Sequence, residues 1–565
     1  MVNLEGICEK AISRIDNNEE IYVKEKLIDG CKNIIRNSMS EEEIRSSVIQ
    51  VALELTTEQE PKWQYVASKL YVERLYDEVK INRNKKIEEI PYSNYYEFIC
   101  EMTNKNLYGK YILENYTKEE IEELEKEIKP ERDFIFTYSG IDLLTKRYLI
   151  QDYNRKPLEL PQQMFMGIAM HLAIPEEKQN RLMWAKKFYD VLSSLKATMA
   201  TPTMSNARKP FYQLSSCFID TVEDSLKGIY KSLDNFAEVS KFGGMGIYIG
   251  KIRAIGSTIR GFKGASGGVI PWIKLFNDTA VAVDQLGVRN GSVAIWLDAW
   301  HKEVPEFLQL RTNNGDDRKK AHDVFPGLCY PDLFWRLAEE DIDANWYMMC
   351  PHEIKNVKGY SLEDFYGEEW EKRYYDCVND ERIDKRIMSV KDIVRLIIKS
   401  VAETGTPFAF YRDTANKMNP NKHAGMIYSS NLCTEIMQNM SPMDIQTTEV
   451  INENGDSIIV EKTKAGDFVV CNLSSIVLGN VNVNNDKEIE YVIETQIRAM
   501  DNVIDLNYYS VPFAEVTNKK YRAIGLGTSG YHHMLANNKI HWNEEKHLEF
   551  TDKVYEKINY YAINA

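Results

Sequence analysis

Apolar residues recur at helical spacing from about residue 19 to residue 80 and again from about residue 92 to residue 196. This period predicts that the chain begins with a largely helical region. One helix is expected to begin at Glu41, and another to run from Trp63 to Leu75. The acidic run at 119–127 is interpreted as the solvated face of a helix rather than as a binding site.

The pattern changes after residue 197, where short apolar runs typical of strands alternate with helical segments such as 224–240 and 393–403. The expected strands are 213–219, 245–249, 293–297, 408–411, 467–471 and 521–526. Repeated alternation of this kind predicts an α/β barrel or an open α/β sheet. The dipeptide Asn454-Gly455, between two β-branched runs, predicts the turn of a β-hairpin inserted at about 445–466.

Composition narrows the class of protein but identifies no partner. The chain has 565 residues, enough for several domains, and its net charge of −15 argues against a nucleic-acid or anionic membrane surface. Nine cysteines are too few for a disulfide scaffold, and the sequence has neither a run of 18 apolar residues nor a signal-peptide core. We therefore expect a cytoplasmic protein with no nucleic-acid or membrane partner, in which any disulfide is transient and catalytic.

The candidate chemistry is concentrated at 431–435, where Asn431, Cys433 and Glu435 occupy alternate positions. If this stretch is extended, the three side chains point in the same direction and present an amide, a thiol and a carboxylate together. Such a set could hold a hydroxylated substrate, remove a proton from it and attack it through sulfur. Cys217 and Cys471 also have polar neighbours, and a redox reaction that starts at one thiol and consumes two others would need all three cysteines.

A cysteine can also be purely structural, because it is usually a small buried apolar residue. We apply that interpretation to Cys8, Cys31, Cys100, Cys329, Cys350 and Cys377. Spacing alone leaves catalysis and simple burial open for Cys217, Cys433 and Cys471. A zinc site is not expected, because no two cysteines have CxxC spacing and the adjacent side chains of His532 and His533 diverge.

Three glycine-rich segments allow more than one interpretation. Residues 242–246 fit a tight turn or a loop whose backbone approaches a ligand, but they lack the GxGxxG pattern of a dinucleotide site. Residues 260–268 and 285–292 carry cationic side chains, and they fit either ordinary surface loops or movable contacts to phosphate groups.

Taken together and in order, these motifs resemble the large catalytic subunit of ribonucleotide reductase, most closely the class I type. The matching segments are 200–204, 213–218, 294–301, 403–407, 430–436, 470–475, 504–509 and 522–527. So many matches in the family's order are far more specific than any single motif.

The resemblance implies a role for each residue of the thiol set. Cys433 would form the thiyl radical that takes the 3′-hydrogen of a ribonucleotide. Glu435 would act as the general base on the 3′-hydroxyl, and Asn431 would hold the ribose hydroxyls by hydrogen bonds. Cys217 would protonate the departing 2′-hydroxyl, and Cys217 and Cys471 would then form a disulfide after supplying two electrons.

The resemblance also implies contacts to substrate and to an allosteric effector. The positions that match substrate contacts are Thr201, Ser216, Gly243 and Gly244. The positions that match the effector site at a subunit interface are Asp224, Ser225, Leu226 and Arg253. The loop at 285–292 resembles the one that reports the bound effector to the substrate base.

The fold implied by the resemblance is an incomplete ten-stranded α/β barrel at 197–565. It would follow a helical domain at 81–196 and a helical remnant of an ATP-cone domain at 1–80, in which no working activity site is expected. The barrel strands and the tyrosine pair that come next in the family would lie beyond residue 565. We therefore expect a missing C-terminal portion or a second polypeptide to complete the barrel.

The implied substrate is a ribonucleoside diphosphate, which is reduced to a 2′-deoxyribonucleotide. No metal or cofactor is expected in this chain, because the radical would come from a separate metal-containing small subunit. The resemblance further implies a homodimer with nucleoside triphosphate effectors, and a thioredoxin- or glutaredoxin-type reductant. Two alternatives stay open: a cobalamin-dependent reductase, which uses a similar thiol set, and a non-catalytic nucleotide-binding fragment.

Overall fold

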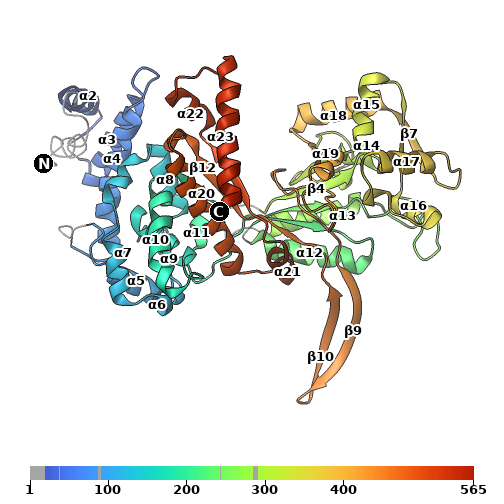
Figure 1. Ribbon diagram of the computed structural model, residues 1–565, viewed down its shortest axis with the longest axis horizontal. Coiled ribbons are helices and arrows are strands. Elements are labelled where there is room, and N and C mark those ends of the chain that lie inside the picture. The colour runs from blue at the N-terminus through green and yellow to red at the C-terminus, as the bar shows by residue number, and fades with distance from the viewer. Residues whose placement is uncertain (1–19, 33, 37, 87–90, 242, 284–290) are drawn as a thin grey trace. The chain divides into compact units, whose positions relative to one another are not determined.

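A computed structural model describes residues 20–32, 34–36, 38–86, 91–241, 243–283 and 291–565 (Figure 1). The chain divides into two compact units. The first comprises Met1–Leu214, Leu473–Leu506 and Leu526–Ala565, and the second comprises Ser215–Asn472 and Asn507–Gly525. Within the described residues, no helix combines the length and the apolar character needed to cross a membrane.

The first unit is mainly helical, as the hydrophobic period predicts. Its elements before the chain enters the second unit are α2 (Glu20–Lys32), α3 (Glu41–Glu54), α4 (Trp63–Asn82), α5 (Tyr95–Asn104), α6 (Tyr111–Asn115), α7 (Lys118–Glu125), η1 (Pro130–Ile135), α8 (Tyr138–Arg147), α9 (Pro161–Leu172), α10 (Lys178–Ser193), β1 (Ala197–Met199) and α11 (Thr201–Asn206). Helix α3 begins at Glu41 as predicted, because Ser40 and Glu43 form a capping box. Helix α4 continues past its predicted end at Leu75.

Later parts of the chain return to complete the first unit. They are β12 (Leu473–Val477), η4 (Leu478–Asn480), α20 (Asp486–Leu506), β13 (Gly525–Ser529), α22 (Tyr531–Asn537) and α23 (Glu545–Asn564). Strands β1, β12 and β13 form a three-stranded sheet in which β1 runs antiparallel to β12.

The second unit is an α/β structure built on a six-stranded sheet with the order β11-β2-β3-β4-β5-β8. Its strands are β2 (Cys217–Thr221), β3 (Gly244–Tyr248), β4 (Val293–Asp298), β5 (Val324–Tyr330), β8 (Phe408–Tyr411) and β11 (Val469–Val470). The first five are parallel, and β11 pairs antiparallel with β2. Because β11 and β8 lie at its two edges, the sheet is open within the described residues, in agreement with the α/β prediction.

Helices and smaller strands surround this sheet. They are α12 (Leu226–Ser240), α13 (Ile270–Ala282), α14 (Val304–Phe307), η2 (Asp317–Lys319), α15 (Asp332–Glu340), β6 (Asn345–Met349), α16 (Pro351–Lys358), η3 (Leu362–Asp364), α17 (Gly367–Val378), β7 (Lys385–Ser389), α18 (Val390–Thr404), α19 (Arg412–Lys417) and α21 (Pro512–Tyr521). One hydrophobic core joins the sheet to these helices, for example through Ile247 of β3, Phe236 of α12 and Phe276 of α13.

Several strands differ from the prediction: the strand expected at 213–219 begins only at Cys217, and β1, β6, β7 and β12 were not expected. Two further differences have a clear physical reason. The run 521–526 is not one strand, because α21 ends at Tyr521 and Arg522 closes it in a left-handed conformation with φ 47°. Strand β5 has no counterpart among the expected strands, because Pro326 and Gly327 interrupt its β pattern. Gly327 is required there, since a β-carbon at this position would collide with the ring of Trp296.

The predicted hairpin at about 445–466 is confirmed. Strands β9 (Asp444–Glu453) and β10 (Asp456–Lys464) pair antiparallel and extend away from the six-stranded sheet (Figure 1). Asn454 and Gly455 connect them with φ values of 54° and 91°, the positive values that a two-residue hairpin turn of type I′ requires.

Strand β3 lies very close to another chain segment at two glycines. A β-carbon on Gly244 would lie 2.6 Å from Cδ2 of Leu432, and one on Gly246 would lie 2.7 Å from Cα of Asn431. Residues 430–432 therefore pass over β3 at a distance that only glycine allows.

This packing accounts for most of the glycine-rich segment at 242–246, in which residue 242 lies outside the described residues. The amide of Gly243 donates to the carbonyl oxygen of Val239 at 2.9 Å, and the amide of Gly244 donates to that of Ser216 at 3.0 Å. Both N–H groups are thus engaged inside the second unit. The missing side chains of these glycines leave room for a neighbouring chain segment. This role differs from both predicted ones, a tight turn and a ligand-binding loop.

We predict that Gly246→Ala lowers the free energy of unfolding by about 1–3 kcal/mol, because the added methyl group overpacks the contact with residues 430–431. Gly267→Ala is the matched control, since its β-carbon would make only an ordinary 3.6 Å contact with Pro271. Denaturant unfolding of both variants measures the difference. Equal effects of the two substitutions would contradict the proposed close packing.

Candidate active site

Cys217 and Cys471 are neighbours across two paired strands, although they are far apart in the chain. Cys217 begins β2, and Cys471 directly follows β11, whose Val470 is paired with Phe218. The amide of Cys471 donates to the carbonyl oxygen of Cys217 at 3.0 Å, which continues the antiparallel register by one residue. Both side chains are buried and their thiols are hydrogen-bonded, without a disulfide between them.

The stretch 431–435 is a turn and not an extended segment, so the expected alternation of its side chains is wrong. The amide oxygen of Asn431 accepts hydrogen bonds from the backbone N–H groups of Glu435 and Ile436, both at 3.1 Å. Thr434 has a φ of 69°. The Asn431 side chain thus replaces a backbone acceptor and bends the chain around Cys433, a known tendency of asparagine.

The turn nevertheless brings the predicted groups together. The sulfur atoms of Cys217 and Cys433 and a carboxylate oxygen of Glu435 all lie within 4.8 Å of one another. Cys217 is buried, whereas Cys433 and Glu435 are exposed, so the group opens to solvent on one side. The amide nitrogen of Asn431 is also buried, and the Asn431 amide lies close enough to the Cys217 thiol to affect its pKa.

The surroundings of Cys217 favour its neutral thiol. The hydrogen bond with Cys433 lowers the pKa of Cys217, and the nearby amide of Asn431 acts in the same direction. The hydrogen bond and charge of Cys471, together with burial, outweigh these effects and raise the pKa of Cys217 to about 12. Near neutral pH Cys217 therefore carries a proton that it can donate.

The predicted substrate contacts fall in both units. Ser216, Gly243 and Gly244 adjoin Cys217 in the second unit, where the Gly244 amide donates to the Ser216 carbonyl oxygen at 3.0 Å. Thr201 is in the first unit, where it begins α11 with its hydroxyl 3.4 Å from that of Tyr148. Contact of these four residues with substrate stays a prediction.

The predicted effector residues form a connected group in the second unit. Nη2 of Arg253 lies 2.9 Å from Oδ2 of Asp224, and Nδ1 of His352 lies 3.4 Å from the same oxygen. Ser225 caps the N-terminus of α12, and Leu226 is 64% exposed at the first helical position. The histidine was not among the sequence-predicted residues, because its position in the chain gives no sign of this contact.

Of the two cationic loops, the structure describes all of the first and only the end of the second. Residues 260–268 fold back on the preceding segment, where Ser266 accepts from the amide of Gly256 at 3.0 Å and donates its own amide to Ser257 at 3.1 Å. The loop at 285–292 lies mostly outside the described residues, which resume at 291. Its role as a reporter of the effector stays a prediction.

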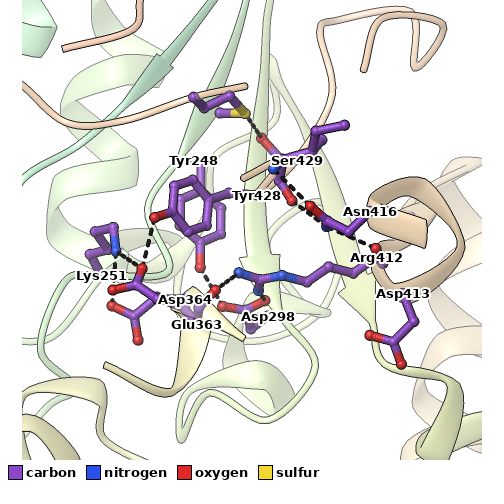
Figure 2. Close-up of polar contacts among 12 residues, drawn as sticks. Tyr248, Lys251, Asp298, Glu363, Asp364, Arg412, Asp413, Asn416, Tyr428 and Ser429 are labelled. Atoms are coloured by element: carbon purple, nitrogen blue, oxygen red, sulfur yellow. Dashed lines mark hydrogen bonds and ion pairs between the residues drawn. The ribbon is translucent and has the colours of Figure 1, made fainter. Parts of the chain in front are cut away.

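A buried network of charges lies at the carboxyl ends of β4 and β8 in the same unit (Figure 2). Arg412 donates to the carboxylate of Asp298 and to the backbone carbonyl oxygen of Glu363. The second carboxylate oxygen of Asp298 accepts from the hydroxyl of Tyr248. Asp298 and Arg412 are almost completely buried, so each of these charges depends on the other for compensation.

Lys251 extends this network to Tyr428. Its Nζ lies 2.8 Å from Asp364 and 3.2 Å from Glu363, and it lies 4.5 Å from the centre of the Tyr428 ring. The Tyr428 hydroxyl donates to Asp364 at 2.7 Å, while its ring stacks on Tyr248 with ring centres 5.1 Å apart. Tyr428 is thus held through its hydroxyl and through the contacts of its ring with Tyr248 and Lys251.

The network fixes the segment that leads into the Cys433 turn. Next to Tyr428, the backbone of Ile427 exchanges two hydrogen bonds with the Asn416 side chain, at 2.8 and 3.0 Å. Asn416 belongs to α19, the helix that begins with Arg412. Sequence reasoning missed this group, although Arg412 directly follows a correctly predicted strand, a position where polar residues often converge.

Comparison with known proteins now identifies the family. Residues 215–565 match the model for "Ribonucleotide reductase, barrel domain", and residues 134–212 match that for "Ribonucleotide reductase, all-alpha domain". The chain belongs to the ribonucleotide reductase large-subunit family. The family membership that the sequence motifs implied is therefore confirmed.

Relatives in this family come from distant organisms. The ribonucleoside-diphosphate reductase subunit alpha of Treponema pallidum is 57% identical over 519 residues, which are 92% of this chain and 61% of that protein. The protein of the same name from Helicobacter pylori is 39% identical over 584 residues, covering 97% of this chain and 71% of that protein. The chain thus spans somewhat less than two thirds of the length of the Treponema relative.

We predict that Cys471→Ala lowers the pKa of Cys217, because it removes the hydrogen bond and the charge that raise this pKa. Only the thiolate reacts with iodoacetamide, so the pH profile of Cys217 alkylation should move to lower pH. Mass spectrometry of the Cys217 peptide measures this profile. Cys100→Ser should leave it unchanged, and an unshifted profile in Cys471→Ala would contradict the assigned environment.

Proposed function

We propose that this chain is the catalytic portion of a ribonucleoside-diphosphate reductase, which reduces ribonucleotides to 2′-deoxyribonucleotides by thiol radical chemistry. The observation that carries the proposal is the convergence of Cys217, Cys433 and Glu435 within 4.8 Å. Cys471 and Asn431 adjoin this group, so an acid, a base, a radical-forming thiol and a two-thiol reductant come together.

In the proposed reaction, the Cys433 thiyl radical takes the hydrogen atom from C3′ of the ribose. Glu435 accepts the proton of the 3′-hydroxyl, and Cys217 gives its proton to the departing 2′-hydroxyl, which leaves as water. Cys217 and Cys471 supply two electrons and become a disulfide, while the remaining thiol hydrogen, that of Cys471, is delivered to C2′. Glu435 returns its proton to the 3′-oxygen. Cys433 then returns a hydrogen atom to C3′ and recovers its radical.

The geometry supports each of these roles. Cys433 and Glu435 are exposed on the turn, where a substrate can reach them. The buried amide of Asn431 lies beside the Cys217 thiol, where it can donate to a ribose hydroxyl. The raised pKa of Cys217 keeps this thiol protonated until the hydroxyl departs.

The proposed partners follow from this chemistry. A separate metal-containing small subunit would supply the radical, and the name "subunit alpha" of the Treponema relative supports a two-subunit reductase over the cobalamin-dependent alternative. A thioredoxin- or glutaredoxin-type protein would reduce the disulfide again in the cytoplasm. Nucleoside triphosphate effectors would bind at Asp224 and Arg253 in a homodimer.

We predict that this chain forms deoxynucleotide when it is assayed together with the C-terminal portion that its longer relatives contain and a radical-generating small subunit. Cys433→Ser should abolish product formation, because the serine hydroxyl does not form the required radical. Cys100→Ser is the control and should retain activity. Deoxynucleotide formation is measured by chromatography, and full activity of Cys433→Ser or no activity under any complementation would contradict the proposal.

A further inference from the structure

The three side chains at the centre of the proposed site also have the composition of a metal-binding site. Cys217 and Cys433 offer two soft sulfur ligands, and Glu435 offers a carboxylate oxygen. Within the described part of the chain, no other group of three His, Cys, Asp or Glu side chains brings its ligand atoms this close together.

We propose that the reduced site binds one soft divalent cation, such as Zn²⁺ or Cd²⁺, through Cys217, Cys433 and Glu435. A water molecule fills the fourth position. The bound cation occupies both thiols and the carboxylate, so it stops the reaction reversibly. This last consequence rests on the proposed function, whereas the binding itself does not.

The distances suit tetrahedral coordination. Zinc bonds of about 2.3 Å to sulfur and about 2.0 Å to oxygen place neighbouring ligand atoms roughly 3.5–3.8 Å apart. The three ligand atoms already lie within 4.8 Å of one another without an ion. Cys433 and Glu435 are exposed, so small side-chain rotations on the turn close the remaining distance.

The framework around the ligands is fixed at both ends. Cys217 begins β2, which is paired on both sides, with β11 and β3, and the Asn431 amide oxygen holds the turn that carries Cys433 and Glu435. The buried Asn431 amide lies beside Cys217, where its N–H can donate to the sulfur once the metal is bound. Solvent reaches the site from the side of the turn, which gives the ion a way in and an open fourth position.

Coordination is an acid–base step and changes no oxidation state. Cys217 and Cys433 each release one proton as a metal–sulfur bond forms, and Glu435 binds as the carboxylate. Oxidation of Cys217 and Cys471 to a disulfide removes two electrons and two protons, and it takes away one of the two sulfur ligands. The site therefore binds the cation only in its reduced form.

Titration of the reduced, metal-free chain with Cd²⁺ under anaerobic conditions tests the proposal. The ultraviolet thiolate-to-cadmium band should report one ion per chain with two thiolate ligands. Cys217→Ser and Cys433→Ser should each halve the band and weaken binding at least about tenfold. Glu435→Gln should weaken binding but keep the full band, because a carboxylate does not contribute to it.

Two controls complete the test. Cys100→Ser should change neither the band nor the affinity, and Cys471→Ala should keep the two-thiolate band because Cys471 is not a ligand. Circular dichroism verifies that each variant is folded, and Glu435→Gln changes an exposed residue that the core does not need. An unchanged titration in Cys433→Ser or in Glu435→Gln would overturn the metal site.

The cadmium band is measured without catalytic turnover. The metal site and the proposed reductase function can therefore be contradicted independently. A completed enzyme that forms deoxynucleotide but gives no cadmium band would overturn the metal site alone. A chain that gives the two-thiolate band but stays inactive under every complementation would overturn the proposed function and leave the metal site in place.

Discussion

The candidate site depends on how closely residues 430–432 pass over strand β3. Gly244 and Gly246 allow this approach, because any β-carbon there would lie well inside contact distance of Leu432 or Asn431. The Cys433 turn begins at this contact, and Cys217 lies on the neighbouring strand β2. The position of this turn over β3 therefore decides how near Cys433 lies to Cys217.

Two further constraints hold the group in place. Antiparallel pairing of β11 with β2 sets Cys471 beside Cys217 through the backbone, so this proximity does not require a disulfide. On the other side, the network of Asp298, Arg412 and Tyr428 holds the segment that enters the turn. Loss of one partner in such a buried pair typically costs about 3–5 kcal/mol, so the network is costly to disturb.

Local sequence signals predicted much of the fold of the second unit. Strands 293–297 and 408–411 were found because they are short apolar runs between helical segments, and the hairpin was found because Asn454-Gly455 suits a type I′ turn. Strand β5 was missed because Pro326 and Gly327 are explained only by tertiary contacts, here the ring of Trp296.

The residues of the site could be predicted more fully than their geometry. Cys433, Glu435 and Asn431 were recognised from their spacing, but the reason offered was wrong, since Asn431 uses its amide oxygen to close a turn. The charge network around Arg412 depends on contacts between segments far apart in the chain, which a single sequence does not reveal.

The roles of the three cysteines are tested by mapping the disulfides that form when the completed enzyme turns over once without an external reductant. One disulfide between Cys217 and Cys471 is expected for each deoxynucleotide formed, with Cys433 still reduced. Product formed while both Cys217 and Cys471 stay reduced, or a disulfide that includes Cys433, would contradict these roles.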